Sequence, residues 1–327
     1  MEDNSNIPRI KITDNNLNNS KNHIHNYSFM EQFRTHLSKI ENILKHELDL
    51  YSWSEFYAPL IYACDGGKRI RPLILVLTAE IIDSKKNTAK NSEVYKSKLD
   101  EDVFLAASAI ELLHTESVIH DDIIDEEKVR RGKPTFHIKY GYNNSILTAD
   151  FVLGIILNIT SKLNNSRISS EIANAAVRMS EGEMMEINLN KNQVITEDDY
   201  IKVLENKTAS LFESSARIGA ILGGGNEDDI KSMGNFGNLI GIAYQIHDDL
   251  DDWNNEERLF NMLMRQNNHS QVLVKRMENL YKSYSIKAKN ELNNVINTID
   301  IKETDKQNKI NKRLKHQLEE LTNLNLI

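Results

Sequence analysis

The sequence predicts an all-α fold in a single domain. From Phe29 onward, apolar residues recur at intervals of three and four, which is the spacing of one face of an α-helix. The 327 residues include only 4 prolines and 13 glycines, so helix breakers are scarce and long helices are favoured. No linker rich in proline or serine divides the chain. One helical domain over residues 29–327 is therefore the expected architecture.

The elements follow one another along the chain. Residues 1–28 are polar and rich in asparagine, which predicts a disordered extension. This segment begins with acidic residues and contains little arginine, unlike a transit peptide or a secretory signal. Helices are expected at about 29–50, 70–83, 100–128, 145–162, 167–188, 197–223 and 228–253, with one or two more after 256. The expected connectors are a lysine-rich surface loop over 84–98 and loops over 132–141 and 188–197.

Charge and cysteine content narrow the class of protein. The formal net charge of -8 argues against nucleic acid as the main partner. Cys64 is the only cysteine, so no intramolecular disulfide can form and a reducing compartment is indicated. We expect the cytoplasm, with the mitochondrion or another organelle as the alternative. The longest apolar stretch, 146–160, is interrupted by Asp150 and Asn158, and we expect no transmembrane segment.

Two acidic clusters stand out, each in an apolar, helix-compatible stretch. The first acidic cluster comprises Asp121, Asp122 and Asp125, and the second comprises Asp248, Asp249 and Asp252. Carboxylates four residues apart lie on one helix face, roughly 6 Å apart, where their charges repel. Magnesium suits such a site, because it takes oxygen ligands and is usually bound by one or two carboxylates plus substrate phosphates. On spacing alone, a solvated acidic helix face explains either cluster equally well.

Basic motifs accompany the acidic clusters. Gly-Gly-Lys-Arg-x-Arg-Pro begins at Gly66, and Arg-Arg-Gly-Lys-Pro-Thr begins at Arg130. The paired glycines allow the backbone to approach an anion closely, and lysine and arginine bind phosphate oxygens. Ordinary ion pairing with nearby carboxylates is the alternative. Together, the acidic and basic motifs indicate a site for a metal-bound phosphate.

The order of these motifs resembles that of the trans-type isoprenyl diphosphate synthases, the polyprenyl synthase family. His-Asp-Asp-x-x-Asp and the arginine motif are followed by Glu-Gly-Glu, Lys-Thr-Ala and Tyr-Gln-Ile-x-Asp-Asp-x-x-Asp, over about residues 30–253. The resemblance implies an isoprenoid-synthase-type helical bundle with a central substrate cavity. It also implies a prenyltransferase that condenses isopentenyl diphosphate with farnesyl or geranylgeranyl diphosphate.

The resemblance also assigns roles, residue by residue. Asp121, Asp125 and Asp248 would bind magnesium, with Asp122, Asp249 and Asp252 in support, and about three ions would accompany the diphosphate. Lys68, Arg71, His114 and Arg131 would bind isopentenyl diphosphate. Arg130 and Lys207 would hold the allylic diphosphate, and oxygens of Thr208 and Gln245 would face the carbocation.

Product length is expected to depend on Glu116 and Ser117, which lie about one helical turn below Asp121. No aromatic ring stands there to close the groove, so a medium- or long-chain polyprenyl diphosphate is expected. Glu116 departs from the family pattern. A carboxylate in a hydrocarbon groove is costly unless it is paired or turned away.

Two further departures leave alternatives open. Glu186 stands where the family commonly has glutamine, and the family's lid loop and about one helix are absent after Asp252. A homodimeric enzyme with a product that can contact membranes is the leading hypothesis. The first alternative is a non-catalytic or regulatory subunit of a heteromeric synthase. A terpene cyclase ranks below both, because such enzymes usually lack the second aspartate cluster.

Overall fold

The structure is a computed structural model that describes residues 32–86, 93–191, 194–251, 259–267, 271–296 and 315–320. For residues 86 and 93–100 only the helical backbone is described. The predicted extension over 1–28, Asp252 and the segment that directly follows it lie outside these ranges.

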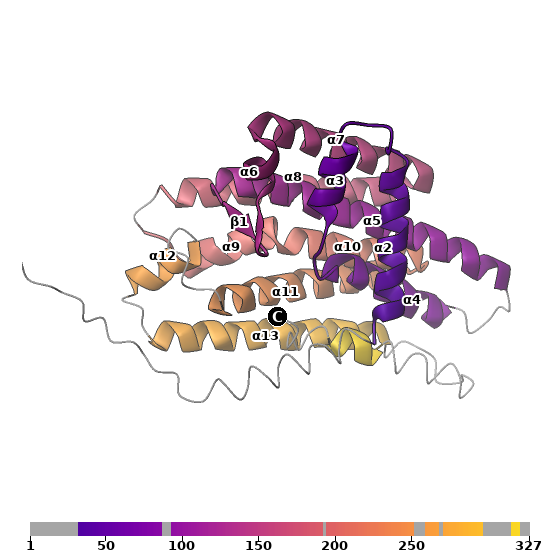
Figure 1. The fold of residues 1–327 in the computed structure, drawn as a ribbon. Coiled ribbons are helices and arrows are strands. Elements are labelled where there is room, and N and C mark those ends of the chain that lie inside the picture. Colours follow the sequence, from indigo (N-terminus) through magenta and orange to yellow (C-terminus); the bar gives the residue numbers. More distant parts are fainter. Residues whose placement is uncertain are drawn as a thin grey trace, which may run out of the picture.

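The predicted all-α fold is confirmed (Figure 1). In chain order the helices are α2 (Arg34–Asp49), α3 (Tyr57–Cys64), α4 (Ile70–Lys86), α5 (Glu93–Ile124), α6 (Phe136–Tyr140), α7 (Tyr142–Leu163), α8 (Ser166–Leu189), α9 (Glu197–Lys207), α10 (Ala209–Leu222), α11 (Glu227–Asp251), α12 (Leu259–Gln266) and α13 (Gln271–Ile296). Residues 315–320 are also helical. Between α5 and α6, strands β1 (Val129–Arg130) and β2 (Lys133–Pro134) form an antiparallel hairpin.

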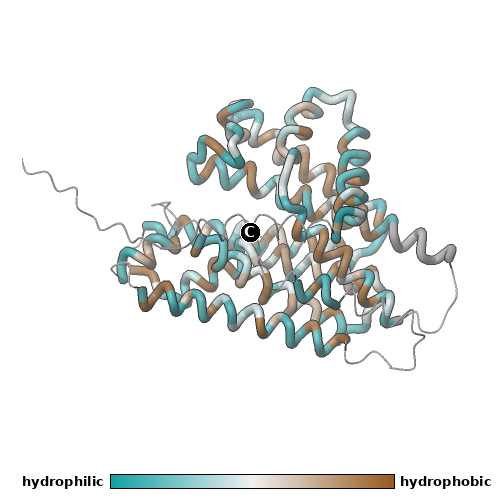
Figure 2. The backbone as a smooth tube through the Cα atoms, turned by 60° about the horizontal axis from the view of Figure 1, so that its bottom comes forward, coloured by the Kyte–Doolittle hydropathy of each residue, from teal (hydrophilic) through white to brown (hydrophobic). Residues whose placement is uncertain are grey.

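The helices pack around several clusters of buried apolar side chains. Figure 1 shows α13 along the bottom, α11 above it and α7 at the top. Hydrophobic and hydrophilic residues alternate along most helices, as expected for amphipathic helices packed side by side (Figure 2). Buried side chains join α2, α5, α7 and α8 in one cluster and α4, α10, α11 and α13 in another.

Two glycines explain how closely α10 and α11 pack. A Cβ atom on Gly237 would lie 2.5 Å from the Phe212 carbonyl oxygen, and one on Gly241 would lie 2.7 Å from the Ala209 Cα. Only glycine permits this approach without moving a helix. The contact brings the C-terminal half of α11, which carries the second acidic cluster, against the start of α10.

Several predicted boundaries were wrong. The expected surface loop over 84–98 is helical at both ends, because α4 runs to Lys86 and α5 begins at Glu93. The expected helix over 197–223 is two helices, α9 and α10, separated at Thr208. The short helix α3 was not predicted, and the expected connector over 132–141 contains β2 and α6.

Within the described residues, α7 is the one helix whose length and composition alone would allow it to cross a membrane. Four of its apolar side chains are buried in the core against α5, namely Val152, Ile155, Ile156 and Ile159. A core helix of a globular domain passes the same test of length and composition.

Candidate active site

The end of α5 divides the first acidic cluster between two sides of the helix. The Asp125 N–H donates to the Asp121 carbonyl at 2.8 Å, so the helical turn continues to Asp125. Glu126 then adopts a left-handed φ of 51°, and the Glu127 N–H donates to the Asp122 carbonyl at 3.1 Å. This arrangement is a helix-terminating Schellman motif. Asp121 and Asp125 line the central cavity, whereas Asp122 does not.

A tight hairpin places the two arginines that follow. Arg131 and Gly132 have φ values of 53° and 73°, and positive φ at both central residues is the signature of a type I′ turn. Arg130 Nε donates to Asp122 Oδ1 at 2.6 Å, which fixes the hairpin to the end of α5. Both arginines line the central cavity. Asp122 therefore holds Arg130 in place.

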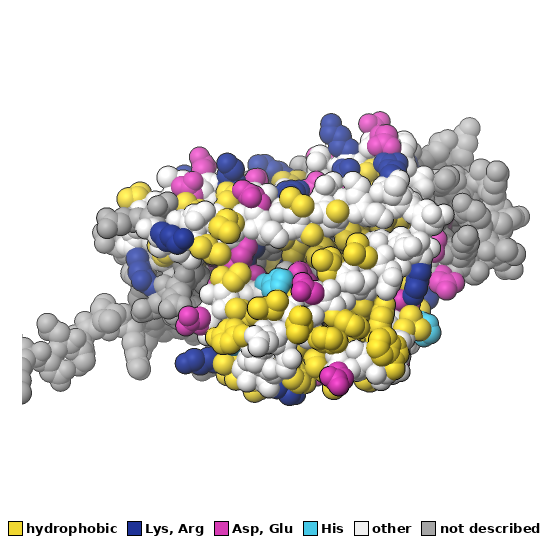
Figure 3. All heavy atoms as spheres, turned by 90° about the horizontal axis from the view of Figure 1, so that it is seen from above, with side chains coloured by type: hydrophobic (Ala, Val, Ile, Leu, Met, Phe, Trp, Pro, Cys, Tyr) yellow, Lys and Arg dark blue, Asp and Glu magenta, His cyan; other side chains and the backbone are white. Residues whose placement is uncertain are grey.

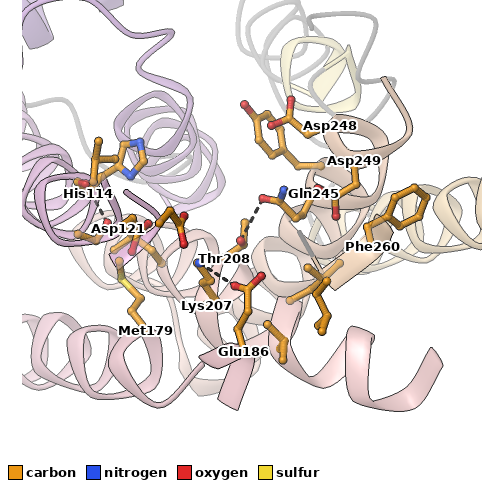
Figure 4. Close-up of a pocket in the computed structure, with 18 of the residues that line it drawn as sticks. His114, Asp121, Met179, Glu186, Lys207, Thr208, Gln245, Asp248, Asp249 and Phe260 are labelled. Carbon is orange, nitrogen blue, oxygen red and sulfur yellow. Dashed lines mark hydrogen bonds and ion pairs between the residues drawn. The ribbon is translucent and has the colours of Figure 1, made fainter. Parts of the chain in front are cut away.

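The central cavity has a volume of about 250 Å³. Asp121 lies on one side of it and Asp248, from α11, lies on the other (Figure 4). Asp125 also lines this cavity. The remaining predicted residues that line it are Arg71, His114, Ser117, Arg130, Arg131, Lys207, Thr208, Gln245 and Asp249. The structure thus brings together side chains from α4, α5, α9, α11 and the hairpin, which are far apart in the sequence.

The carboxylates of this cavity are held in an unfavourable environment. Burial, together with the charges of Glu183 and Asp125, raises the pKa of Asp121 to about 7, although Lys207 opposes this shift. Burial likewise raises the pKa of Asp125 to about 6. A divalent cation would offset both the desolvation and the repulsion between these groups.

Lys207 is held by two carboxylates of α8. Its Nζ lies 2.5 Å from Glu183 Oε2 and 2.7 Å from Glu186 Oε2. Burial alone would lower the pKa of Lys207, but Glu186, Asp121 and Glu183 together raise it above its ordinary value. The ammonium is therefore charged, and it faces the central cavity beside Glu186 (Figure 4).

A second cavity, of about 470 Å³, adjoins the first. It is lined by all four residues predicted to bind isopentenyl diphosphate, namely Lys68, Arg71, His114 and Arg131. Arg71 Nη1 lies 3.2 Å from His114 Nε2. Burial and the charge of Arg71 hold the pKa of His114 well below its ordinary value, so the neutral imidazole accepts from the guanidinium.

Arg69, in the same basic motif, has a structural role. It adopts a left-handed φ of 52° and is 6% exposed. Its guanidinium donates to Glu111 at 2.5 Å, to Glu41 at 2.6 Å and to the Cys64 carbonyl at 2.6 Å. With these donors engaged, Arg69 fixes the loop that carries Lys68 and leads into α4, which carries Arg71.

The donor chemistry of the central cavity fits magnesium. The candidate ligands Asp121, Asp125 and Asp248 offer only carboxylate oxygens, which hard cations prefer. In the described part of the chain, no three histidine, cysteine, aspartate or glutamate side chains converge into a ready-made metal cage. Magnesium is usually bound by one or two carboxylates plus waters and substrate phosphates, so such a cage is not required.

A third, more apolar cavity of about 710 Å³ extends from the first along α5 and α8. The two cavities share Ser117, Asp121, Met179 and Lys207. Glu116 lines the third cavity, and its Oε1 lies 3.2 Å from His120 Nδ1, so this carboxylate is paired. The sequence analysis did not identify Leu113, Met179 and Met184 as apolar walls of this cavity. Each lies three or four residues from another residue that lines the cavity, and this helical spacing could have indicated them.

Comparisons with known proteins agree with this geometry. A family model described as polyprenyl synthetase matches residues 54–314. A geranylgeranyl diphosphate synthase of Methanosarcina mazei is 30% identical over 231 residues, which are 69% of this chain and 67% of that protein. An octaprenyl diphosphate synthase of Escherichia coli is 34% identical over 189 residues, 58% of this chain and 54% of that protein. The crystal structure of Thermotoga maritima geranyltranstransferase matches with a TM-score of 0.68 at 24% identity, covering 88% of this chain and 99% of that one.

The fold and the site define an all-α protein whose cavity is lined by facing carboxylates and by basic side chains. The chain belongs to the polyprenyl synthetase family. Its match to the curated relatives spans from about half to two thirds of their length.

Proposed function

We propose that the protein is a prenyltransferase that condenses isopentenyl diphosphate with an allylic diphosphate, farnesyl or geranylgeranyl diphosphate. The observation that carries this proposal is that Asp121, Asp125 and Asp248 line one cavity that opens into a second, basic cavity. The two cavities share Arg71, His114, Arg130, Arg131, Tyr244 and Asp248. Two diphosphates bound in them would place their hydrocarbon parts side by side.

The residues of the central cavity hold the allylic diphosphate. Asp121, Asp125 and Asp248 would hold about three magnesium ions, which would supply Lewis-acid stabilisation of the leaving diphosphate. Arg130 and Lys207 bind diphosphate oxygens and neutralise the charge that develops as the carbon–oxygen bond breaks. The result is an allylic carbocation beside the diphosphate.

The residues of the second cavity orient isopentenyl diphosphate. Lys68, Arg71 and Arg131 bind its diphosphate, and the neutral His114 keeps the Arg71 guanidinium in place. The isopentenyl double bond then attacks the cation. The departing diphosphate takes the proton that is lost, so no histidine has to act as a base.

Fixed oxygen dipoles stabilise the cation. Thr208 Oγ1 donates to Gln245 Oε1 at 3.1 Å, and both side chains line the central cavity (Figure 4). Apolar residues such as Leu211 and Phe260 line the same cavity and limit the access of water. In such a site, oriented dipoles are more effective than in water.

We propose a medium- or long-chain polyprenyl product. The growing chain would pass Ser117 and Met179 into the third cavity, where Glu116 is paired with His120. The curated relatives include enzymes named for products from geranylgeranyl to octaprenyl diphosphate. A product of this kind would bring the protein into peripheral contact with membranes, and we assign the protein to the cytoplasm.

A homodimer is supported by an exposed apolar face. Figure 3 views the molecule from the side on which α7 lies and shows hydrophobic side chains gathered there. On α7 the exposed apolar side chains are Tyr142, Ile146, Leu147, Leu153 and Leu157, and on α8 they are Val177 and Met184. Exposed apolar patches mark protein–protein or membrane interaction sites, and we propose that this one contacts a second copy of the chain.

The activity is tested by incubating the protein with labelled isopentenyl diphosphate, magnesium, and farnesyl or geranylgeranyl diphosphate as the primer. Wild-type protein is expected to extend the primer, and Asp121→Ala or Asp248→Ala to abolish extension. If the wild type binds the allylic substrate but yields no product under varied metals and primers, the non-catalytic subunit hypothesis replaces this proposal. Size-exclusion chromatography with light scattering tests the homodimer.

A further inference from the structure

We propose that Tyr200 and Asp249 are positioning residues that fix the orientation of the Gln245 carboxamide. This inference rests on the proposed function, in which the Gln245 oxygen faces the carbocation. It also implies that Asp249 is not itself a magnesium ligand, although it belongs to the second acidic cluster.

Both oxygens of Asp249 accept hydrogen bonds from side chains. Gln245 Nε2 donates to Asp249 Oδ1 at 2.9 Å, and the Tyr200 hydroxyl donates to Asp249 Oδ2 at 2.6 Å. Asp249 is 6% exposed and Tyr200 is 1% exposed. The Tyr200 ring packs against Phe260 with its centroid 5.7 Å away, so the hydroxyl is held in position.

The chemistry of Asp249 decides which way the amide of Gln245 points. An ionised carboxylate can only accept hydrogen bonds, so the neighbouring end of the amide must be its nitrogen. The amide oxygen then faces the opposite way and accepts from Thr208 Oγ1 at 3.1 Å. A chain of hydrogen bonds thus runs from Tyr200 through Asp249 and Gln245 to Thr208.

This orientation matters for the proposed chemistry. An amide oxygen directed at a cation stabilises it, whereas a reversed amide would present its partially positive N–H₂ group to the same cation. Without a fixed acceptor at Asp249, both orientations of the amide become accessible. Tyr200 acts in turn by holding the second oxygen of Asp249.

Binding of Mn²⁺ with inorganic diphosphate, measured by calorimetry, tests whether Asp249 is a metal ligand. We expect Asp249→Asn to bind within twofold of wild type and the matched variant Asp248→Asn to bind at least tenfold more weakly. Equal weakening by both substitutions would overturn the inference. This readout does not depend on turnover.

Thermal unfolding tests the contact between Gln245 and Asp249. Gln245→Glu places two carboxylates against each other and should lower Tm. Adding Asp249→Asn restores a donor and an acceptor and should recover most of the lost Tm. If the second substitution fails to restore Tm, the proposed contact is wrong.

Steady-state kinetics tests the positioning role. Tyr200→Phe keeps the ring and removes the hydroxyl, and we expect kcat to fall at least fivefold. The KM of each substrate and the Mg²⁺ concentration for half-maximal rate should stay within twofold of wild type. An unchanged kcat, or a shift in the Mg²⁺ requirement, would contradict the inference. An inactive wild type would refute the proposed function. The calorimetric and unfolding results would still show whether Asp249 is a metal ligand and whether it contacts Gln245.

Discussion

Gly182 of α8 lies directly against the backbone of Lys207, and a Cβ atom added to this glycine would stand 2.7 Å from the Lys207 Cα. This approach explains why a glycine separates the two glutamates of the Glu-Gly-Glu motif. It sets Glu183 and Glu186 beside the Lys207 ammonium at the point where α9 ends and α10 begins.

Gly182→Ala should therefore push α8 away from Lys207. We expect a loss of about 1–3 kcal/mol in unfolding free energy, measured by denaturant titration, together with a lower kcat. Gly154→Ala is the matched control within one subunit, because an added Cβ there meets no atom of the same chain within 4 Å. Because Gly154 lies on the proposed dimer face, both variants are compared at a protein concentration at which the subunits are separate. The control should be neutral or stabilise by up to about 1 kcal/mol, since alanine favours a helix. If both variants behave alike, close packing at Gly182 is not the cause.

The raised pKa values of Asp121 and Asp125 predict how stability depends on pH. Between about pH 4 and pH 7 the folded protein binds more protons at these sites than the unfolded chain does, so their contribution to unfolding free energy falls as pH rises. His114 acts in the opposite direction, because its pKa lies below its ordinary value. A comparison of wild type with Asp121→Asn isolates the contribution of Asp121 to the pH dependence of stability.

We expect the metal-free Asp121→Asn variant to gain Tm relative to wild type as pH rises from 4 to 7, with no further gain above pH 8. Mg²⁺ with inorganic diphosphate should reverse the ranking by stabilising the wild type more. A constant difference in Tm across this pH range would contradict the buried carboxylate interpretation.

Lys68 and Arg69 are adjacent in sequence but should respond differently to substitution. Arg69→Ala leaves Glu111 buried and unpaired, and we expect a loss of about 3–5 kcal/mol in unfolding free energy. Lys68→Ala should change stability by no more than about 0.5 kcal/mol and raise the KM for isopentenyl diphosphate. Chemical denaturation and substrate titration on both variants distinguish a structural role for Arg69 from the proposed binding role of Lys68.

Ser117→Phe should shorten the product. Ser117 lines both the central cavity and the apolar third cavity, so an aromatic ring there would block the passage between them. Chromatography of products should show a shift toward shorter chains. Extension of a short allylic primer by a single unit should remain measurable, which distinguishes a blocked passage from a damaged site. An unchanged product distribution would place the growing chain elsewhere.

The sequence alone determined the fold class and the candidate chemistry. The helical period of apolar residues and the scarcity of proline and glycine predicted an all-α fold. The spacing of Asp121 and Asp125 placed both on one face, because residues four apart are neighbours on any helix. The order of the motifs alone indicated the family.

Only the tertiary structure decided which motif residues face the cavity and which support them. Asp122 pairs with Arg130, and Arg69 is buried against Glu111, 42 residues away in the sequence. Asp249 accepts from Tyr200, 49 residues away. Sequence spacing fixes neighbours within one helix, but the partner of a buried polar group comes from whichever distant element packs against it.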